Sequence, residues 1–349
     1  MNKLKAVSLF SGCGGLDIGA HLAGIETVSC LEIDGDCVGT LRTNRIFKNA
    51  RIFEEDITSF STSKLKKVLK EEKAKDIIVI GGPPCQPFSK AGYWIGHSRR
   101  KGIKDERNLV GEFLRIVKSL KPAGFLLENV ESILHPRHKV VVDDLVSRIS
   151  TLGYEYKLIK ASALDFGVPQ KRNRVFIIGL KGRFKIHEPK KTHCSPGRVQ
   201  ETGLKAYEAV GKFIEKYNRP EFFEEEEVTE HGTYGKELRE IPPGKNYFAL
   251  SERDNPENPR FRANKRFWNF LLKLHPAIPS WTIAAQPGPW VGPFHWTSRR
   301  LRVPEIAAIQ TFPENYKFSG TRRSIQRQIG NAVPPLLAKA MVSFLKENL

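Results

Sequence analysis

The chain has 349 residues, of which 40% are hydrophobic and 27% are charged, so its composition is that of a globular protein with room for two domains. Its 57 Lys and Arg residues exceed its 38 Asp and Glu residues, and the formal charge of +19 favours a polyanionic partner, nucleic acid before an anionic membrane surface. No apolar run approaches the roughly 20 residues that cross a bilayer, so a cytoplasmic location without membrane contact is expected.

The five cysteines are an odd number and none belongs to a C-x-x-C pair, which argues against a disulfide framework and against structural zinc. The nine histidines add no ligand set. His135 and His138 flank Pro136, and His193 has only Cys194 beside it. Reduced thiols and no metal site are therefore predicted.

The first predicted strand, residues 6–10, runs directly into the glycine-rich turn 11–15, and a helical pattern starts at Leu16. Such a turn lets a ligand approach the backbone and the positive end of the helix. The spacing differs from the dinucleotide pattern G-x-G-x-x-G because Asp17 takes the place of the last glycine.

Two acidic residues follow the next predicted strands. Glu32 ends the strand 27–33, and Asp56 follows a short strand at 51–53. In nucleoside-binding α/β folds, an acid at the first position accepts hydrogen bonds from ribose hydroxyls, and the second acid is placed to accept from an adenine amino group. Each acid alone is more often a helix cap or a loop residue, but together after a glycine turn they indicate an adenosine site.

A cysteine follows the most apolar predicted strand. Residues 77–80 read IIVI, and the glycines and prolines after them end the strand, so Cys85 is delivered at its carboxyl end on a stiff loop. The structural alternative is a small buried hydrophobe, as most free cysteines are. A loop rich in Pro and Gly presents a thiol better than it buries one, so the pattern favours a nucleophile.

The long loop 85–107 is typical of a lid or binding loop, and its cations are placed to meet phosphates. Glu128 follows a buried strand at 125–127. An extended segment at 170–174 joins two more strands, 154–161 and 175–180, and it places Gln170, Arg172 and Arg174 on one side.

Strands and helices alternate to residue 180, which predicts an α/β fold with a doubly wound sheet. The segment from 182 to about 298 is rich in Pro, Gly and charge and contains a basic aromatic stretch at 261–270. We expect it to form a second, smaller and irregular domain. The predicted boundaries are 1–184 for the first part of the catalytic domain, 185–285 for the small domain and 286–349 for the return to the catalytic domain.

The order of motifs resembles that of the cytosine-C5 DNA methyltransferases. The matching pieces are FSGCGG at 10–15, Glu32, EDI at 55–57, GGPPCQPFS at 81–89, ERNL at 106–109, ENV at 128–130, QKRNR at 170–174, RRLRVPEIAAIQTFP at 299–313 and QIGNAVPP at 328–335. The resemblance implies a class I methyltransferase sheet with S-adenosyl-L-methionine as cofactor, and a target-recognition domain with double-stranded DNA in the cleft.

The resemblance also implies roles for individual residues. Cys85 would add to C6 of a flipped-out cytosine, Glu128 would protonate N3, Arg174 would bind O2 and Arg172 would hold Glu128 and the loop. The residues expected at the cofactor are Phe10, Ser11, Gly12, Gly14, Gly15, Glu32, Ile33, Asp56, Ile57, Pro83, Leu109 and Asn331. Those expected at the DNA are Ser89, Arg99, Arg100, Lys101, Gln170, Arg260, Arg262, Arg266, Arg299 and Arg300.

This resemblance suggests a prokaryotic modification enzyme that is monomeric. The enzyme would share its DNA site with a restriction endonuclease without forming a stable complex with it. Two alternatives remain open at this point. One is a tRNA cytosine methyltransferase with the same catalytic segments, and the other is a catalytically inactive homologue that binds DNA. A nucleotide-binding dehydrogenase is disfavoured because the dinucleotide glycine pattern is missing.

Overall fold

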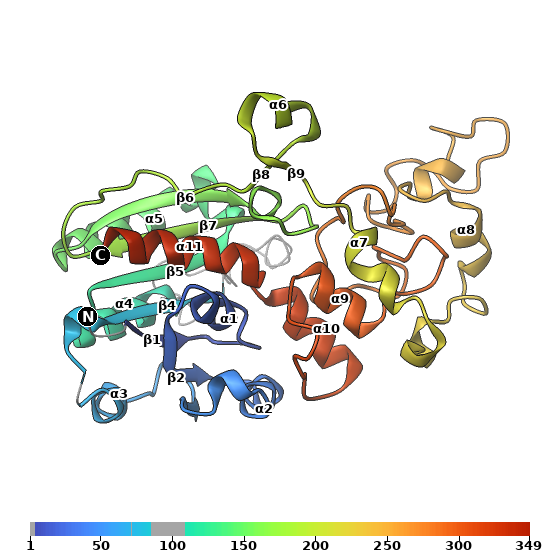
Figure 1. Ribbon diagram of the computed structural model, residues 1–349. Helices are drawn as coiled ribbons and strands as arrows, with labels where there is room; N and C mark the ends of the chain where they lie inside the picture. The colour runs from blue at the N-terminus through green and yellow to red at the C-terminus, as the bar shows by residue number, and fades with distance from the viewer. Residues whose placement is uncertain (1–3, 71, 85–108) are drawn as a thin grey trace.

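The computed structural model describes residues 4–70, 72–84 and 109–349. A seven-stranded sheet with the order β3-β2-β1-β4-β5-β7-β6 forms the main body (Figure 1). Strands β3, β2, β1, β4 and β5 are parallel, and β7 runs antiparallel to both β5 and β6. The strands are β1 Lys5–Leu9, β2 Glu26–Glu32, β3 Arg51–Glu54, β4 Ile77–Gly81, β5 Gly124–Val130, β6 Glu155–Ser162 and β7 Asn173–Leu180. The α/β class and the doubly wound sheet are confirmed.

Alternate residues of the central strands face opposite layers of helices. Val79 and Phe125 belong to the cluster that packs on α3 (Thr62–Val68), α4 (Leu109–Leu120) and α5 (Lys139–Thr151). Ile80 and Leu126, one position further along each strand, belong to the cluster beneath α1 (Gly15–Leu22) and α11 (Pro335–Asn348). This period-two pattern explains why the strands are apolar on both faces.

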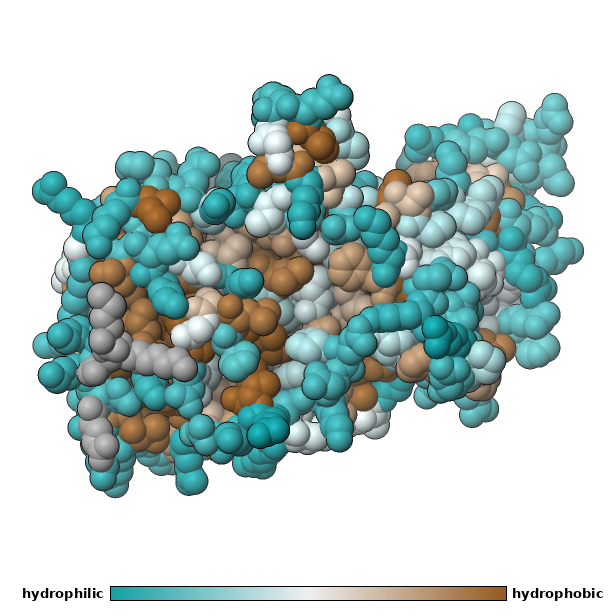
Figure 2. Space-filling view, in the orientation of Figure 1, coloured by the Kyte–Doolittle hydropathy of each residue, from teal (hydrophilic) through white to brown (hydrophobic). Residues whose placement is uncertain are grey.

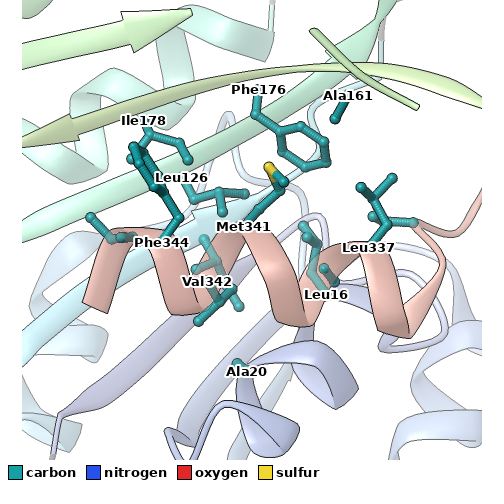
Figure 3. Close-up of a cluster of buried hydrophobic side chains, with 14 of the residues drawn as sticks. Leu16, Ala20, Leu126, Ala161, Phe176, Ile178, Leu337, Met341, Val342 and Phe344 are labelled. Atoms are coloured by element: carbon teal, nitrogen blue, oxygen red, sulfur yellow. The ribbon is translucent and has the colours of Figure 1, made fainter. Parts of the chain in front are cut away.

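The last helix of the chain completes the second layer. Met341 and Phe344 of α11 lie against Phe176 and Ile178 of β7 (Figure 3). On its other side α11 packs against α1 so closely that a Cβ on Gly19 would lie 2.3 Å from the Cβ of Ala338. Glycine at position 19 therefore allows the two helices to meet.

A second, smaller lobe lies beside the sheet, and the helices α9 (Val303–Ile309) and α10 (Arg322–Asn331) lie between the two (Figure 1). Between 207 and 302, all of it described, the chain forms only the short helices α7 (Gly211–Ile214) and α8 (Gly235–Glu240), 3-10 turns and isolated bridges, as predicted. The two longer helices α9 and α10 then lead back to the sheet. A small protrusion precedes the lobe and consists of β8 (His193–Cys194), α6 (Val199–Thr202) and β9 (Lys205–Ala206).

The small lobe extends beyond the predicted boundary at 285. Its hydrophobic cluster runs from Leu238 to Phe294, and the backbone N–H groups of Phe294 and Leu274 donate to the carbonyl oxygens of Leu272 and Phe294 respectively. The outer end of this lobe is covered mainly by hydrophilic residues (Figure 2). Among the described residues, none of the helices is long and apolar enough to cross a membrane.

One buried carboxylate lies beneath the glycine turn. Asp17 of α1 is 0% exposed and accepts hydrogen bonds from the hydroxyls of Ser8 and Thr27, each at 3.0 Å. Burial raises the pKa of its carboxyl to about 6. Protonation of Asp17 therefore stabilises the folded state. This contribution to the free energy of unfolding is complete below the usual pKa of 3.8 and is lost as the pH rises through about 6.

We predict that Asp17→Asn weakens the pH dependence of stability. Through Asp17, the wild-type protein should be about 1.4 kcal/mol more stable at about pH 5 than at about pH 7.5, and the variant should lack this difference. Denaturant unfolding at the two pH values measures it. The exposed control Asp143→Asn should behave as the wild type, and equal pH dependence in all three proteins would contradict the assignment.

Candidate active site

The carboxyl ends of the parallel strands open into a cavity of about 820 Å³. This is the edge at which open α/β sheets bind ligands. All but one of the residues predicted to meet a cofactor line this cavity, and they come from six separate segments. They are Phe10, Ser11, Gly12, Gly15, Glu32, Ile33, Asp56, Ile57, Pro83, Leu109 and Asn331.

Gly14 is the exception, and the structure corrects its predicted role. It has φ of 80° and lies outside the cavity lining, where an added Cβ would stand 2.6 Å from the ring of Phe47 and 3.0 Å from the hydroxyl of Tyr316. Gly14 is therefore required for the left-handed turn and for core packing.

Glu32 is held at the end of β2 by three backbone amides. One carboxylate oxygen accepts from the N–H of Gly12 at 2.7 Å, and the other accepts from those of Ile33 and Asp34 at 2.9 Å each. Burial raises the pKa of Glu32, while these amides oppose the shift. The amides orient the carboxylate, and its two oxygens retain acceptor capacity for a ligand in the cavity.

Phe10 has a backbone feature that sequence reasoning missed. Its φ is 53°, in the left-handed region that a residue with a bulky side chain rarely adopts. This conformation turns the chain at the end of β1, and Phe10 then lines the cavity. A strained residue at a ligand site is a recognised signal of function, but only coordinates reveal it.

An acid and an arginine meet at the opposite wall of the cavity. The Nε of Arg174 lies 2.8 Å from Oε1 of Glu128, and both side chains are almost buried. Burial raises the pKa of Glu128, and the charges of Arg174 and Arg172 partly counteract it. The register of antiparallel β5 and β7, which pairs Val130 with Arg174, brings the two side chains together.

The same wall contains Pro83 and Pro84. Cys85 follows them in the sequence but lies outside the described residues, as do Ser89, Arg99, Arg100 and Lys101.

The predictions for Gln170 and Arg172 need correction. Gln170 was expected at the DNA, but its side chain is 0% exposed and bonds to the side chain of Gln310 and the N–H of Ile283. Arg172 was expected to hold Glu128, but its guanidinium is buried and donates to the carbonyl oxygens of Gly330 at 2.7 Å and Ala332 at 2.9 Å. Both residues tie the segment that precedes β7 to parts of the chain that are far away in sequence.

Two of the predicted DNA cations are also structural. Arg299 forms a bidentate ion pair with Glu305, whose side chain is 0% exposed, with N–O distances of 2.8 and 2.7 Å. Arg300 is half-buried and donates to the carbonyl oxygen of Pro289. Arg260 pairs with Glu240 at the surface. Arg262 and Arg266 are exposed as well, and neither forms an ion pair with a carboxylate in the described part of the chain.

The antiparallel seventh strand in the order 3-2-1-4-5-7-6, with a cavity at the carboxyl ends of β1, β2 and β4, defines a class I methyltransferase. Residues 4–347 match the model of the C-5 cytosine-specific DNA methylases. The chain belongs to that family and is a DNA (cytosine-5)-methyltransferase. Members of the family use S-adenosylmethionine.

Similar proteins match over nearly the whole of this chain. The Type II methyltransferase M.SacI of Streptomyces achromogenes is 35% identical, over 100% of this chain and 94% of the relative. M.NgoFVII of Neisseria gonorrhoeae is 32% identical, over 99% and 88%. The solved structure of a Spodoptera frugiperda DNMT2 mutant has a TM-score of 0.65 at 16% identity, covering 99% of this chain and 100% of that one, which shows the shared fold.

We predict that Arg172→Lys destabilises the protein by roughly 2 to 4 kcal/mol, because a single ammonium cannot replace the planar guanidinium between two buried carbonyls. The amides of 330–332 should also exchange hydrogen faster. Denaturant unfolding and hydrogen exchange test this, with Arg148→Lys at an exposed ion pair as the control. A variant as stable as the control would contradict the structural role given to Arg172.

Proposed function

We propose that this chain is the modification enzyme of a Type II restriction–modification system, and that it methylates C5 of a cytosine turned out of a specific duplex DNA sequence. The observation that carries the proposal is the Glu128–Arg174 pair, which lies in the same cavity as Glu32 and beside the two prolines that precede Cys85. The full-length relatives named Type II methyltransferases support the biological role.

The cavity fits an adenosine-containing cofactor. The oriented carboxylate of Glu32 suits ribose hydroxyls, Asp56 suits an adenine amino group, and the side chains of Phe10 and Ile33 offer apolar surfaces to the ring. Asn331 reaches the cavity from the segment that Arg172 holds. S-adenosylmethionine bound here would supply the methyl group on a positively charged sulfur.

Cytosine C5 is a weak nucleophile, so the protein must activate the ring. In the proposed reaction the thiolate of Cys85 forms a bond to C6, and the ring electrons move toward N3 and O2. Glu128 donates a proton to N3, while Arg174 orients Glu128 and binds O2. After methylation, the proton on C5 passes to water and the bond between Cys85 and C6 breaks.

The burial of Glu128 serves this role. Removal from water raises the pKa of its carboxyl and so favours the protonated form that can donate. The positive charges of Arg174 and Arg172 act in the other direction, so the acid stays able to release the proton. The site thereby keeps a carboxyl group that gives and recovers a proton during one turnover.

We predict that Glu128→Gln lowers kcat by about 10² to 10⁴, the usual contribution of a general acid. Because the protonated acid is active, wild-type kcat should fall as the pH rises through the raised pKa of Glu128, and the variant should lose this limb. Initial rates across pH measure both effects. Glu131→Gln, at an exposed residue in the 3-10 helix that follows β5, should keep the wild-type profile.

The reaction and its target can be tested together. DNA from cells expressing the wild-type chain should carry 5-methylcytosine at one recurring sequence, and Cys85→Ser should abolish it while DNA binding survives. Bisulfite sequencing reads the modified positions. Methyl transfer to tRNA alone, or methylation that persists in Cys85→Ser, would overturn the proposal.

A further inference from the structure

The small lobe presents an aromatic ring to water. The side chain of Phe267 is 72% exposed, the largest value among the large hydrophobic residues in the described part of the chain, and Trp268 beside it is 48% exposed. Exposed aromatic surface is unfavourable in water and marks a surface that a partner covers.

The loop that carries this ring, residues 262–268, is anchored along its length. The hydroxyl of Tyr247 donates to the carbonyl oxygen of Arg266 at 2.9 Å, and the side-chain amide of Asn246 donates to that of Trp268 at 2.5 Å. The N–H of Ala263 donates to Glu252 at 2.9 Å. The exposed position of Phe267 is therefore held by its loop.

The charge around the ring indicates the chemistry of the partner. Arg262, Lys265 and Arg266 are exposed on the same loop, and Arg262 and Lys265 form no ion pair with any described carboxylate. Phe223 is also exposed, at 59%, but the acidic residues 224–227 follow it. The surroundings of Phe267 suit a polyanion that also offers apolar surfaces between which a ring can insert. Duplex DNA has this character, because its base pairs stack between two rows of phosphates.

A chain of contacts joins the loop to the active site. The rings of Trp268 and Trp281 are 4.8 Å apart, and the ammonium of Lys171 lies 4.1 Å from the centre of the Trp281 ring. Lys171 is three residues before Arg174, which pairs with Glu128. Trp268, the neighbour of Phe267 in the sequence, is thus linked by packed side chains to Lys171, in the segment that leads into the strand of Arg174.

We propose that Phe267 is a wedge that inserts between base pairs of the bound duplex, while Arg262 and Lys265 bind the flanking phosphates. This inference rests on the proposed function for the presence of duplex DNA, and it adds a residue that positions the duplex. The wedge bends or unstacks the DNA and so favours sequences that deform easily. Phe267 is thereby a specificity-determining residue that forms no hydrogen bond to a base.

Salt dependence separates the wedge from the cations. Genomic DNA fragments that the wild type methylates serve as the probe, and binding is measured over a range of salt concentrations. Phe267→Ala should bind about tenfold more weakly without changing the slope of log K against log salt, because no counterion is released by a phenyl ring. Arg262→Ala and Lys265→Ala should each reduce that slope by about 1.

Matched variants control for folding and for chemistry. Phe223→Ala should bind and methylate DNA as the wild type does. Phe267→Trp, which keeps an aromatic ring at this position, should bind DNA as tightly as the wild type. When the protein is bound to relaxed circular plasmid in the presence of topoisomerase, each bound Phe267→Ala molecule should unwind the DNA less than each bound wild-type molecule does. Unfolding midpoints should be equal, since Phe267 is exposed.

The outcomes distinguish the two proposals. If the wild type methylates DNA but Phe267→Ala matches Phe223→Ala in affinity and unwinding, the wedge is wrong and the proposed function stands. A loss of affinity for tRNA and not for duplex DNA would also overturn the wedge. A wild type that does not methylate DNA would instead contradict the proposed function.

Discussion

The buried pairing of Glu128 with Arg174 is the interaction on which the site depends. A carboxyl removed from water favours its neutral form, and an adjacent guanidinium favours its charged form, so burial and Arg174 act in opposite directions on the pKa of Glu128. This balance requires β5 and β7 to run antiparallel in one register, which the parallel part of the sheet does not supply. The reversed strand therefore places the Glu128–Arg174 pair in the cavity.

The wall on the other side of the cavity depends on buried polar contacts that cross the fold. Arg172 holds the backbone at Gly330 and Ala332, and Gln310 donates to the carbonyl oxygen of Ile329 while accepting from Gln170. Gln170 also binds the N–H of Ile283, at the edge of the small lobe. The segment that leads into β7, the strand of Arg174, thus also positions a cavity wall and the edge of the small lobe.

Much of the fold and the cavity could be predicted because parallel strands end at a common edge. The positions of Glu32 and Glu128 follow from strand ends alone, whereas the burial of Gln170 and Arg299 does not. Side-chain alternation says which way a residue points, but the cover over it comes from segments more than a hundred residues away in the case of Gln170. The turn at Phe10 was equally hidden, since nothing in its residue type indicates a positive φ.

The position of α11 has a consequence for the making of the protein. Residues 330–333 line the cavity, and the helix that follows them fills the space between α1 and β7. During synthesis the glycine turn and the acidic strand ends emerge first, but the part of the sheet that α11 covers stays exposed until α11 leaves the ribosome. Ligand binding is thus deferred until α11 has been synthesised, and a chain truncated before α11 would expose apolar sheet to chaperones and proteases.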